Sequence, residues 1–191
     1  MPLDVDRARR GVYAFLSRVL TREVELDELD ALREAVGSLP AWLGSRASQA
    51  LEGDDEDVYL SLKVDFTKTF LLYIHPYESV FRDPSGLLCT DLSVSVKRYY
   101  QKAGYEPDLA STGVRCFDHI GLELEFMARL IEEGDVGLQV RFMEDHLGRW
   151  APVLGIVVSE TASTGFYRTV GEMLAHFILA DYEYLSGEVD G

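Results

Sequence analysis

Cysteines, basic residues and long apolar runs are all scarce in this sequence. Its two cysteines, Cys89 and Cys116, show no C-x-x-C spacing, so we expect free thiols in a reducing cytoplasm and no disulfide framework. No apolar stretch reaches the roughly 20 residues of a membrane-spanning helix, so no membrane insertion is expected. The 18 basic residues face 33 acidic ones, giving a net charge of −15. That charge argues against nucleic acid and anionic lipid as partners and suits a cationic partner.

The usual catalytic motifs are also missing. The chain has no G-x-S-x-G nucleophile elbow, no H-E-x-x-H zinc motif and no P-loop. Its four histidines are scattered along the sequence. We therefore predict no catalytic residues.

Apolar residues recur at helical spacing along most of the chain, which predicts an all-α protein. We expect a single domain over residues 1–191, built as a bundle of roughly eight to ten helices. Residues 104–115 show no periodicity and are expected to form a long loop that acts as a hinge. The β-branched run after Trp150 is compatible with a strand, but the lack of a partner strand favours a helix.

Arg9 and Arg10 precede a short apolar stretch, an arrangement similar to a twin-arginine export signal. Polar residues interrupt that stretch from Ser17 onward. We therefore expect an amphipathic first helix, with Asp4 as its N-cap, and not a removable signal.

A helix over residues 56–74 is predicted to bury Phe66, Phe70 and Tyr73 and to end before Pro76, since the residue before a proline avoids the α region.

The most apolar helix is expected behind the pair Asp118-His119 and to end at Gly134. We expect Asp118 to cap this helix and His119 to hydrogen-bond a neighbouring loop. An alternative is a metal-dependent helical enzyme, because His119 and Glu123 are four residues apart and could begin a metal site with Asp118. The Glu-x-x-His motifs of helical di-metal sites are missing, so no metal is predicted. A generic helical adaptor is a further alternative.

Four short motifs follow one another along the chain. They are Tyr73-x-x-Pro76-Tyr77-Glu78-Ser79 with Phe81, Asp118-His119-Ile120 with Glu123-Leu124-Glu125, Phe142-x-x-x-His146-Leu147-x-x-Trp150, and Phe166-Tyr167 before the last helix. In this order, over about residues 5–185, they resemble the TorD/DmsD/NarJ family of redox-enzyme maturation chaperones.

The resemblance implies a TorD-like helical fold and a cytoplasmic chaperone without enzyme activity. Members of that family bind the twin-arginine signal peptide and the apo catalytic subunit of a molybdenum or tungsten oxidoreductase until its cofactor has been inserted. The resemblance implies no cofactor of the chaperone's own beyond weak binding of guanine nucleotide or molybdopterin cofactor. It is compatible with a monomer or a dimer formed by swapped lobes.

The motif residues predict where the peptide binds. Its arginines would bind to carboxylates, and its apolar stretch would lie in a groove lined by aromatic and aliphatic side chains. The predicted peptide-binding residues are Tyr73, Pro76, Tyr77, Glu78, Ser79, Arg115, Phe117, Asp118, His119, Leu122, Glu123 and Glu125.

Arg115 is the main departure from the family pattern. It stands where the family usually carries a glutamate, so a cation replaces an anion at the mouth of the expected site. We expect Arg115 to pair with Glu78 or Asp118.

Overall fold

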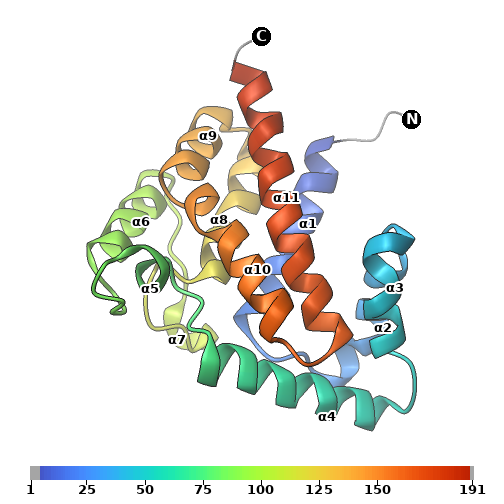
Figure 1. Ribbon diagram of the computed structural model, residues 1–191. Coiled ribbons are helices and arrows are strands. Elements are labelled where there is room, and N and C mark those ends of the chain that lie inside the picture. Colours follow the sequence, from blue (N-terminus) through green and yellow to red (C-terminus); the bar gives the residue numbers. More distant parts are fainter. Residues whose placement is uncertain (1–4, 190–191) are drawn as a thin grey trace. The chain divides into compact units, whose positions relative to one another are not determined.

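The computed structural model describes residues 5–189, and these residues form helices joined by turns (Figure 1). Within that range there is no β-strand, only one isolated bridge between Tyr77 and His119. The all-α prediction is confirmed, and the run after Trp150 is helical. The expected N-cap Asp4 lies outside the described residues.

The chain divides into two compact units, and each is assembled from separate stretches of sequence. Unit 1 comprises residues 1–22, 76–152 and 177–191, and unit 2 comprises residues 23–75 and 153–176. The expected hinge segment, residues 104–115, lies within unit 1 and contains a short helix. The single domain with a hinge at this segment remains a prediction.

Unit 1 is organised around two helices that pack closely, α1 and α8. Ser17 in α1 donates its hydroxyl to the carbonyl of Gly121 in α8 at 2.8 Å. A Cβ on Gly121 would come within 1.9 Å of Thr21 Oγ1, so only glycine permits this approach. The helices of unit 1 are α1 (Val5–Thr21), α5 (Glu78–Arg82), α6 (Asp91–Lys102), α7 (Leu109–Thr112), α8 (Ile120–Glu133), α9 (Val136–Asp145), η3 (Leu147–Arg149) and the second half of α11 (Gly165–Val189).

A buried ion pair joins the two ends of the chain within unit 1. Arg9 in α1 donates to Asp181 in α11 at 2.5 and 3.1 Å, and Tyr13 donates its hydroxyl to the same carboxylate at 2.8 Å. Gln139 in α9 accepts a further hydrogen bond from Arg9 at 3.0 Å. Burial, with the nearby Asp181 charge, raises the pKa of Tyr13. This network fixes α1, α9 and the end of α11 relative to one another.

Unit 2 is built around α4 and the helical hairpin α10–α11. Its elements are η1 (Leu26–Glu28), α2 (Leu29–Gly37), α3 (Ala41–Ala50), α4 (Asp55–Phe66), η2 (Thr67–Tyr73), most of α10 (Ala151–Thr161) and the first half of α11.

The buried Asp65 of α4 binds the turn of that hairpin. It accepts hydrogen bonds from the backbone N–H groups of Ser163 and Thr164 at 2.9 and 2.7 Å. Gly155 and Gly171 allow α10 and α11 to approach closely, since a Cβ on either glycine would lie 2.6 Å from the other's carbonyl oxygen.

The segment predicted as one helix over residues 56–74 contains two types of helix in succession. It is α-helical to Phe66 and then π-helical through η2, a wider turn that often occurs at functional sites. Phe66 and Phe70 are buried as expected, but Tyr73 is 69% exposed, so its predicted burial is wrong. Since the π-turn changes the angular step per residue, α-helical spacing no longer gives the correct face beyond Phe66.

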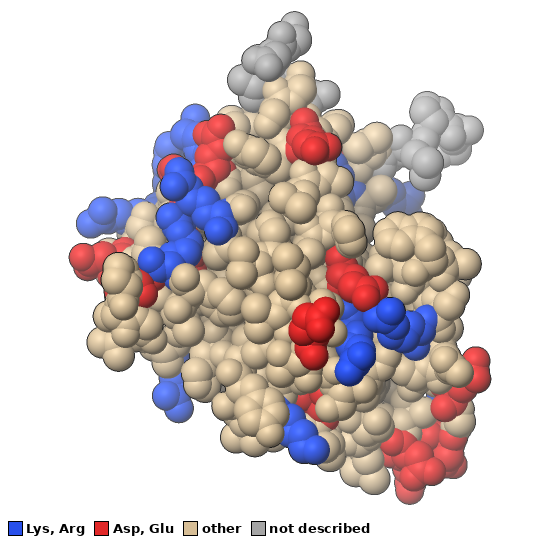
Figure 2. All heavy atoms as spheres, in the orientation of Figure 1, with Lys and Arg blue, Asp and Glu red and all other residues tan. Residues whose placement is uncertain are grey.

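Acidic side chains gather where α4 begins, at the lower right of Figure 2. Asp54 caps the helix by accepting from the N–H groups of Glu56 and Asp57, so part of this charge satisfies the helix N-terminus. No helix within residues 5–189 is both long and apolar enough to cross a membrane.

Candidate functional site

The first two sequence motifs meet in unit 1 through backbone hydrogen bonds. Glu78 donates its N–H to the carbonyl of Asp118, and Ile120 donates to the carbonyl of Pro76, both at 2.9 Å. Tyr77 and His119 thus form the isolated antiparallel bridge, and their rings meet edge to face at 4.9 Å. Residues about 40 positions apart in the sequence are therefore brought together, as the resemblance implies.

The roles of Asp118 and His119 are the reverse of those expected. His119 is the N-cap of α8, and its Nδ1 accepts the N–H of Gly121 at 3.1 Å. Asp118 instead accepts the N–H of Ser79 at 2.8 Å and so caps α5 from the other motif. The expectation failed because α8 begins at Ile120, which leaves His119 in the extended conformation that an N-cap residue adopts.

His119 is held neutral by its surroundings. It is 5% exposed, and burial lowers its pKa from 6.5 to about 3. Since Nδ1 accepts a hydrogen bond, the remaining proton lies on Nε2. The imidazole thus serves as a structural cap and carries no charge at neutral pH.

A polar cluster lies beside these motifs. It consists of the buried side chains Glu78, Glu123, His146 and Trp150 and the half-buried Arg82. Glu78 is fully buried, forms an ion pair with Arg82 and hydrogen-bonds His146 Nδ1 at 2.7 Å. Trp150 donates its indole N–H to Glu123 at 3.1 Å. Through this cluster the third motif contacts the first two.

Glu123 is the carboxylate of the cluster with an incomplete set of hydrogen bonds. It is fully buried, and one of its oxygens, Oε1, has no hydrogen-bond partner. Burial raises its pKa, and the negative charge of Glu78 adds to this rise, while the Trp150 N–H opposes it.

The twelve predicted residues divide sharply by exposure. Tyr73, Arg115 and Glu125 are exposed and Phe117 is half-buried. The remaining eight are buried, namely Pro76, Tyr77, Glu78, Ser79, Asp118, His119, Leu122 and Glu123. Tyr73 belongs to unit 2, whereas the other eleven belong to unit 1.

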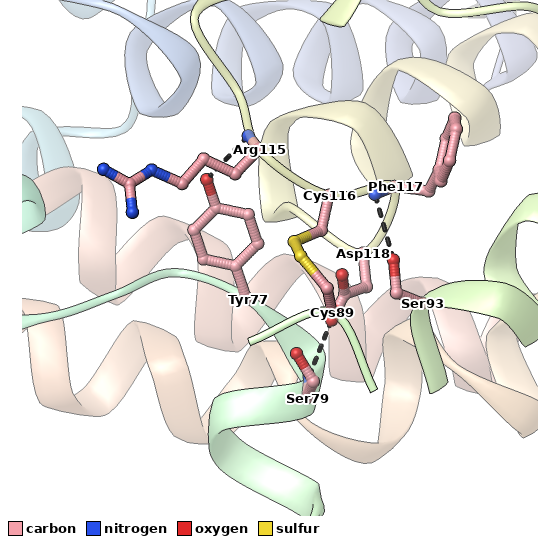
Figure 3. The surroundings of a disulfide bond; sticks show 8 residues. All are labelled: Tyr77, Ser79, Cys89, Ser93, Arg115, Cys116, Phe117 and Asp118. Carbon is pink, nitrogen blue, oxygen red and sulfur yellow. Dashed lines mark hydrogen bonds between the residues drawn. A yellow bond between two sulfur atoms is a disulfide. The ribbon is translucent and has the colours of Figure 1, made fainter. Parts of the chain in front are cut away.

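Arg115 forms neither of the two expected ion pairs. Its side chain is exposed, and Figure 3 shows it extending past Tyr77 and away from Asp118. Its backbone N–H donates to the Tyr77 hydroxyl at 3.2 Å. Glu78 is already paired with Arg82 and His146, so the expected pairing of Arg115 with Glu78 or Asp118 is wrong.

Phe117 lies between two anchors. Its N–H donates to Ser93 Oγ at 3.1 Å, and its carbonyl accepts from the Tyr100 hydroxyl at 3.0 Å. The ammonium of Lys97 lies 4.7 Å from the centre of its ring, a cation–π contact. The segment before α8 is therefore tied to α6 as well as to α5.

Cys89 and Cys116 form a disulfide, with their Cα atoms 5.4 Å apart. The expectation of free thiols is wrong. Spacing along the sequence, 27 residues here, gives no information about proximity in space, and two cysteines at this Cα distance are within bonding range.

Sequence reasoning left Arg82, His146 and Trp150 out of the predicted site. Arg82 lies four residues after Glu78 on one helix, the spacing of an ion pair, and this signal was available. His146 and Trp150 belonged to the third motif, whose position relative to Glu78 and Glu123 only the fold reveals.

Two hollows are found elsewhere in the molecule. One of about 420 Å³ in unit 2 is lined by residues including Arg33, Glu52 and Asp55, and one of about 530 Å³ in unit 1 by residues including Arg10 and Glu132. Neither includes a predicted site residue. The described residues hold no group of three or more His, Cys, Asp or Glu side chains placed to bind a metal ion.

Comparisons with known proteins agree on one family. The family model described as nitrate reductase delta subunit matches residues 25–154, more than half of the chain. The chaperone protein TorD of Salmonella bongori is 33% identical, with 95% of this chain and 92% of the relative aligned. That of Aliivibrio fischeri is 26% identical, with 94% of this chain and 95% of the relative aligned. That of Aliivibrio salmonicida is 28% identical over 85% of this chain.

Proposed function

Because the chain belongs to the nitrate reductase delta subunit family, we propose that it is a cytoplasmic maturation chaperone for a molybdenum or tungsten oxidoreductase. Its relatives named as TorD chaperones align with it over most of its length, and this observation carries the proposal. The protein is not an enzyme, since those relatives are chaperones. Its client would be the apo catalytic subunit, held until the cofactor has been inserted.

The client segment we propose is the twin-arginine signal peptide, which combines two guanidinium groups with an apolar stretch. The net charge of −15 would attract such a cationic segment. Among the predicted carboxylates, Glu125 is exposed and can accept a guanidinium without rearrangement. Glu78, Asp118 and Glu123 are fully buried, so they would reach the peptide only after the surrounding loops open.

Within unit 2, exposed apolar side chains on α4 and η2 form a separate candidate contact site for a client chain. Leu60, Val64, Leu71, Leu72 and Tyr73 are each at least half exposed along α4 and η2. Clustered exposed apolar side chains on a soluble protein mark contact sites for other chains. An apolar helical segment of the client would bury one face against these side chains.

Calorimetry with a twin-arginine signal peptide and its Lys-Lys counterpart tests the proposal. We expect the Arg-Arg peptide to bind more tightly by about tenfold, because a planar guanidinium forms bidentate pairs that an ammonium cannot form. Glu125→Gln should weaken Arg-Arg binding, and Glu160→Gln, an exposed carboxylate of unit 2 outside the motifs, serves as the control. Equal affinity for the two peptides, or no binding of either, would refute signal-peptide recognition.

A further inference from the structure

The disulfide between Cys89 and Cys116 lies within the motif region. Its surroundings include Tyr77, Ser79 and Asp118 (Figure 3). Cys116 stands two residues before Asp118 and is 2% exposed, whereas Cys89 is exposed. Cys89 therefore lies on the solvent side of the cross-link, and Cys116 belongs to the segment that carries the second motif.

Cys89 is held in an unfavourable backbone conformation. Its φ is +60°, and it is the one non-glycine residue with positive φ in the described part of the chain. A side chain disfavours this left-handed region, so the loop gains by relaxing once its cross-link is cut.

The disulfide links the loop 83–90 covalently to the segment before α8. Among the described residues, no hydrogen bond joins residues 83–90 to residues 113–119. The latter segment is tied independently, through Tyr77, Ser93 and Tyr100. Reduction would therefore release the loop 83–90 while the second motif stays anchored.

Two buried polar groups near the disulfide lack a hydrogen-bond partner. Asp118 is fully buried, and its Oδ1 has no hydrogen-bond partner. The hydroxyl of Ser79 is likewise buried without a partner. Unsatisfied buried acceptors are costly, and a guanidinium reaching them would supply the missing donors.

We propose that Cys89–Cys116 is a thiol–disulfide exchange site, whose reduction by a dithiol opens the motif region to the client peptide. The peptide part of this inference rests on the proposed function. A thiolate of the dithiol attacks Cys89 Sγ, forming a mixed disulfide and releasing Cys116 as a thiolate, which takes up a proton. The second thiol of the reductant loses its proton and attacks the reductant's own sulfur in the mixed disulfide, which releases Cys89 as a thiolate that takes up a proton. The dithiol leaves as a disulfide, and the protein has gained two electrons and two protons.

The exchange site is tested on the intact protein with reduced and oxidised dithiothreitol. Samples equilibrated at a series of reductant ratios are alkylated with iodoacetamide and weighed by mass spectrometry. We expect both cysteines to pass together from unmodified to doubly alkylated as the reductant ratio rises. Two alkylatable thiols at every ratio, including the fully oxidised sample, would overturn the proposal.

Opening is measured by hydrogen exchange of the backbone amides in residues 83–90. Reduction should speed their exchange at least tenfold, and Cys89→Ser should show the fast rate under both redox conditions. Unchanged exchange on reduction would overturn the opening step, whether or not any peptide binds.

Calorimetry then separates this inference from the proposed function. We expect the reduced protein to bind the Arg-Arg peptide about tenfold more tightly than the oxidised protein, within the range usual for coupled sites. Equal affinities in the two redox states would overturn redox control while leaving the chaperone function intact. Faster exchange on reduction without peptide binding in either state would refute signal-peptide recognition and, with it, redox control of binding.

Discussion

Replacing the buried cap His119 by asparagine should change how the stability of the protein depends on pH. Asparagine can accept the same N–H of Gly121, so the helix cap is retained while the titratable group is lost. The smaller side chain loses its contact with the Tyr77 ring, which lowers stability by an amount that does not vary with pH.

The magnitude follows from proton linkage. Burial lowers the His119 pKa to about 3 in the folded protein, against 6.5 for an ordinary histidine. Below pH 6.5 the unfolded chain binds a proton at this residue that the folded protein does not bind, so stability falls as the pH falls. Between pH 7.5 and 4.5 this one group should lower the free energy of unfolding by about 2.7 kcal/mol, and the loss ends near pH 3.

Urea denaturation followed by circular dichroism, at several pH values from 4.5 to 7.5, measures this loss. Glu123 has a raised pKa in the folded state, so its contribution runs in the opposite direction and grows as the pH falls. That contribution is common to the wild type and to His119→Asn and cancels in their difference. From pH 7.5 to pH 4.5, the unfolding free energy of His119→Asn should therefore rise by about 2.7 kcal/mol relative to that of the wild type. Parallel pH profiles for the two proteins would refute the assignment of His119 as a buried neutral cap.

Three further changes test other parts of the structure. Asp65→Ala should cost about 3 kcal/mol in chemical denaturation, since it removes a buried carboxylate that accepts two backbone N–H groups and the Thr164 hydroxyl; a loss below about 1 kcal/mol would contradict this role. Gly171→Ala should lower the melting temperature, because its Cβ would lie 2.6 Å from backbone atoms of α10, while Gly187→Ala, with open space around it, should not. Equal melting temperatures for those two variants would refute the close helix approach. Cys89→Ser should cost about 3.5 kcal/mol in oxidising buffer, from opening a 27-residue loop, and nothing in dithiothreitol; the same cost in both buffers would show that the side chain, and not the cross-link, matters.

The helical fold could be predicted because its signals are local. Apolar spacing identified most helices, and Gly134, with a φ of +72°, ends α8 where a glycine was expected to end it. The burial of Tyr73 was predicted wrongly, because the π-helical turn changes the angular spacing of residues that the prediction assumed. An error of one residue in the start of α8 was enough to exchange the expected roles of Asp118 and His119.

The candidate site was only partly predictable, because its contacts join distant parts of the sequence. Glu78 and His146 are 68 residues apart, and no pattern within either segment encodes their pairing. The same holds for the disulfide. The family resemblance identified the motifs but not the burial of their carboxylates, which depends on how unit 1 packs around them.

The interleaving of the two units has a consequence for the order in which the protein can fold during synthesis. Unit 2 lacks α10 and the first half of α11 until residue 176 has been made, and unit 1 needs residues beyond 176. Arg9 emerges 172 residues before Asp181, so it lacks its buried partner until the second half of α11 has been made. Unit 2 therefore has all its residues once residue 176 has been made, whereas unit 1 must wait for the second half of the last helix.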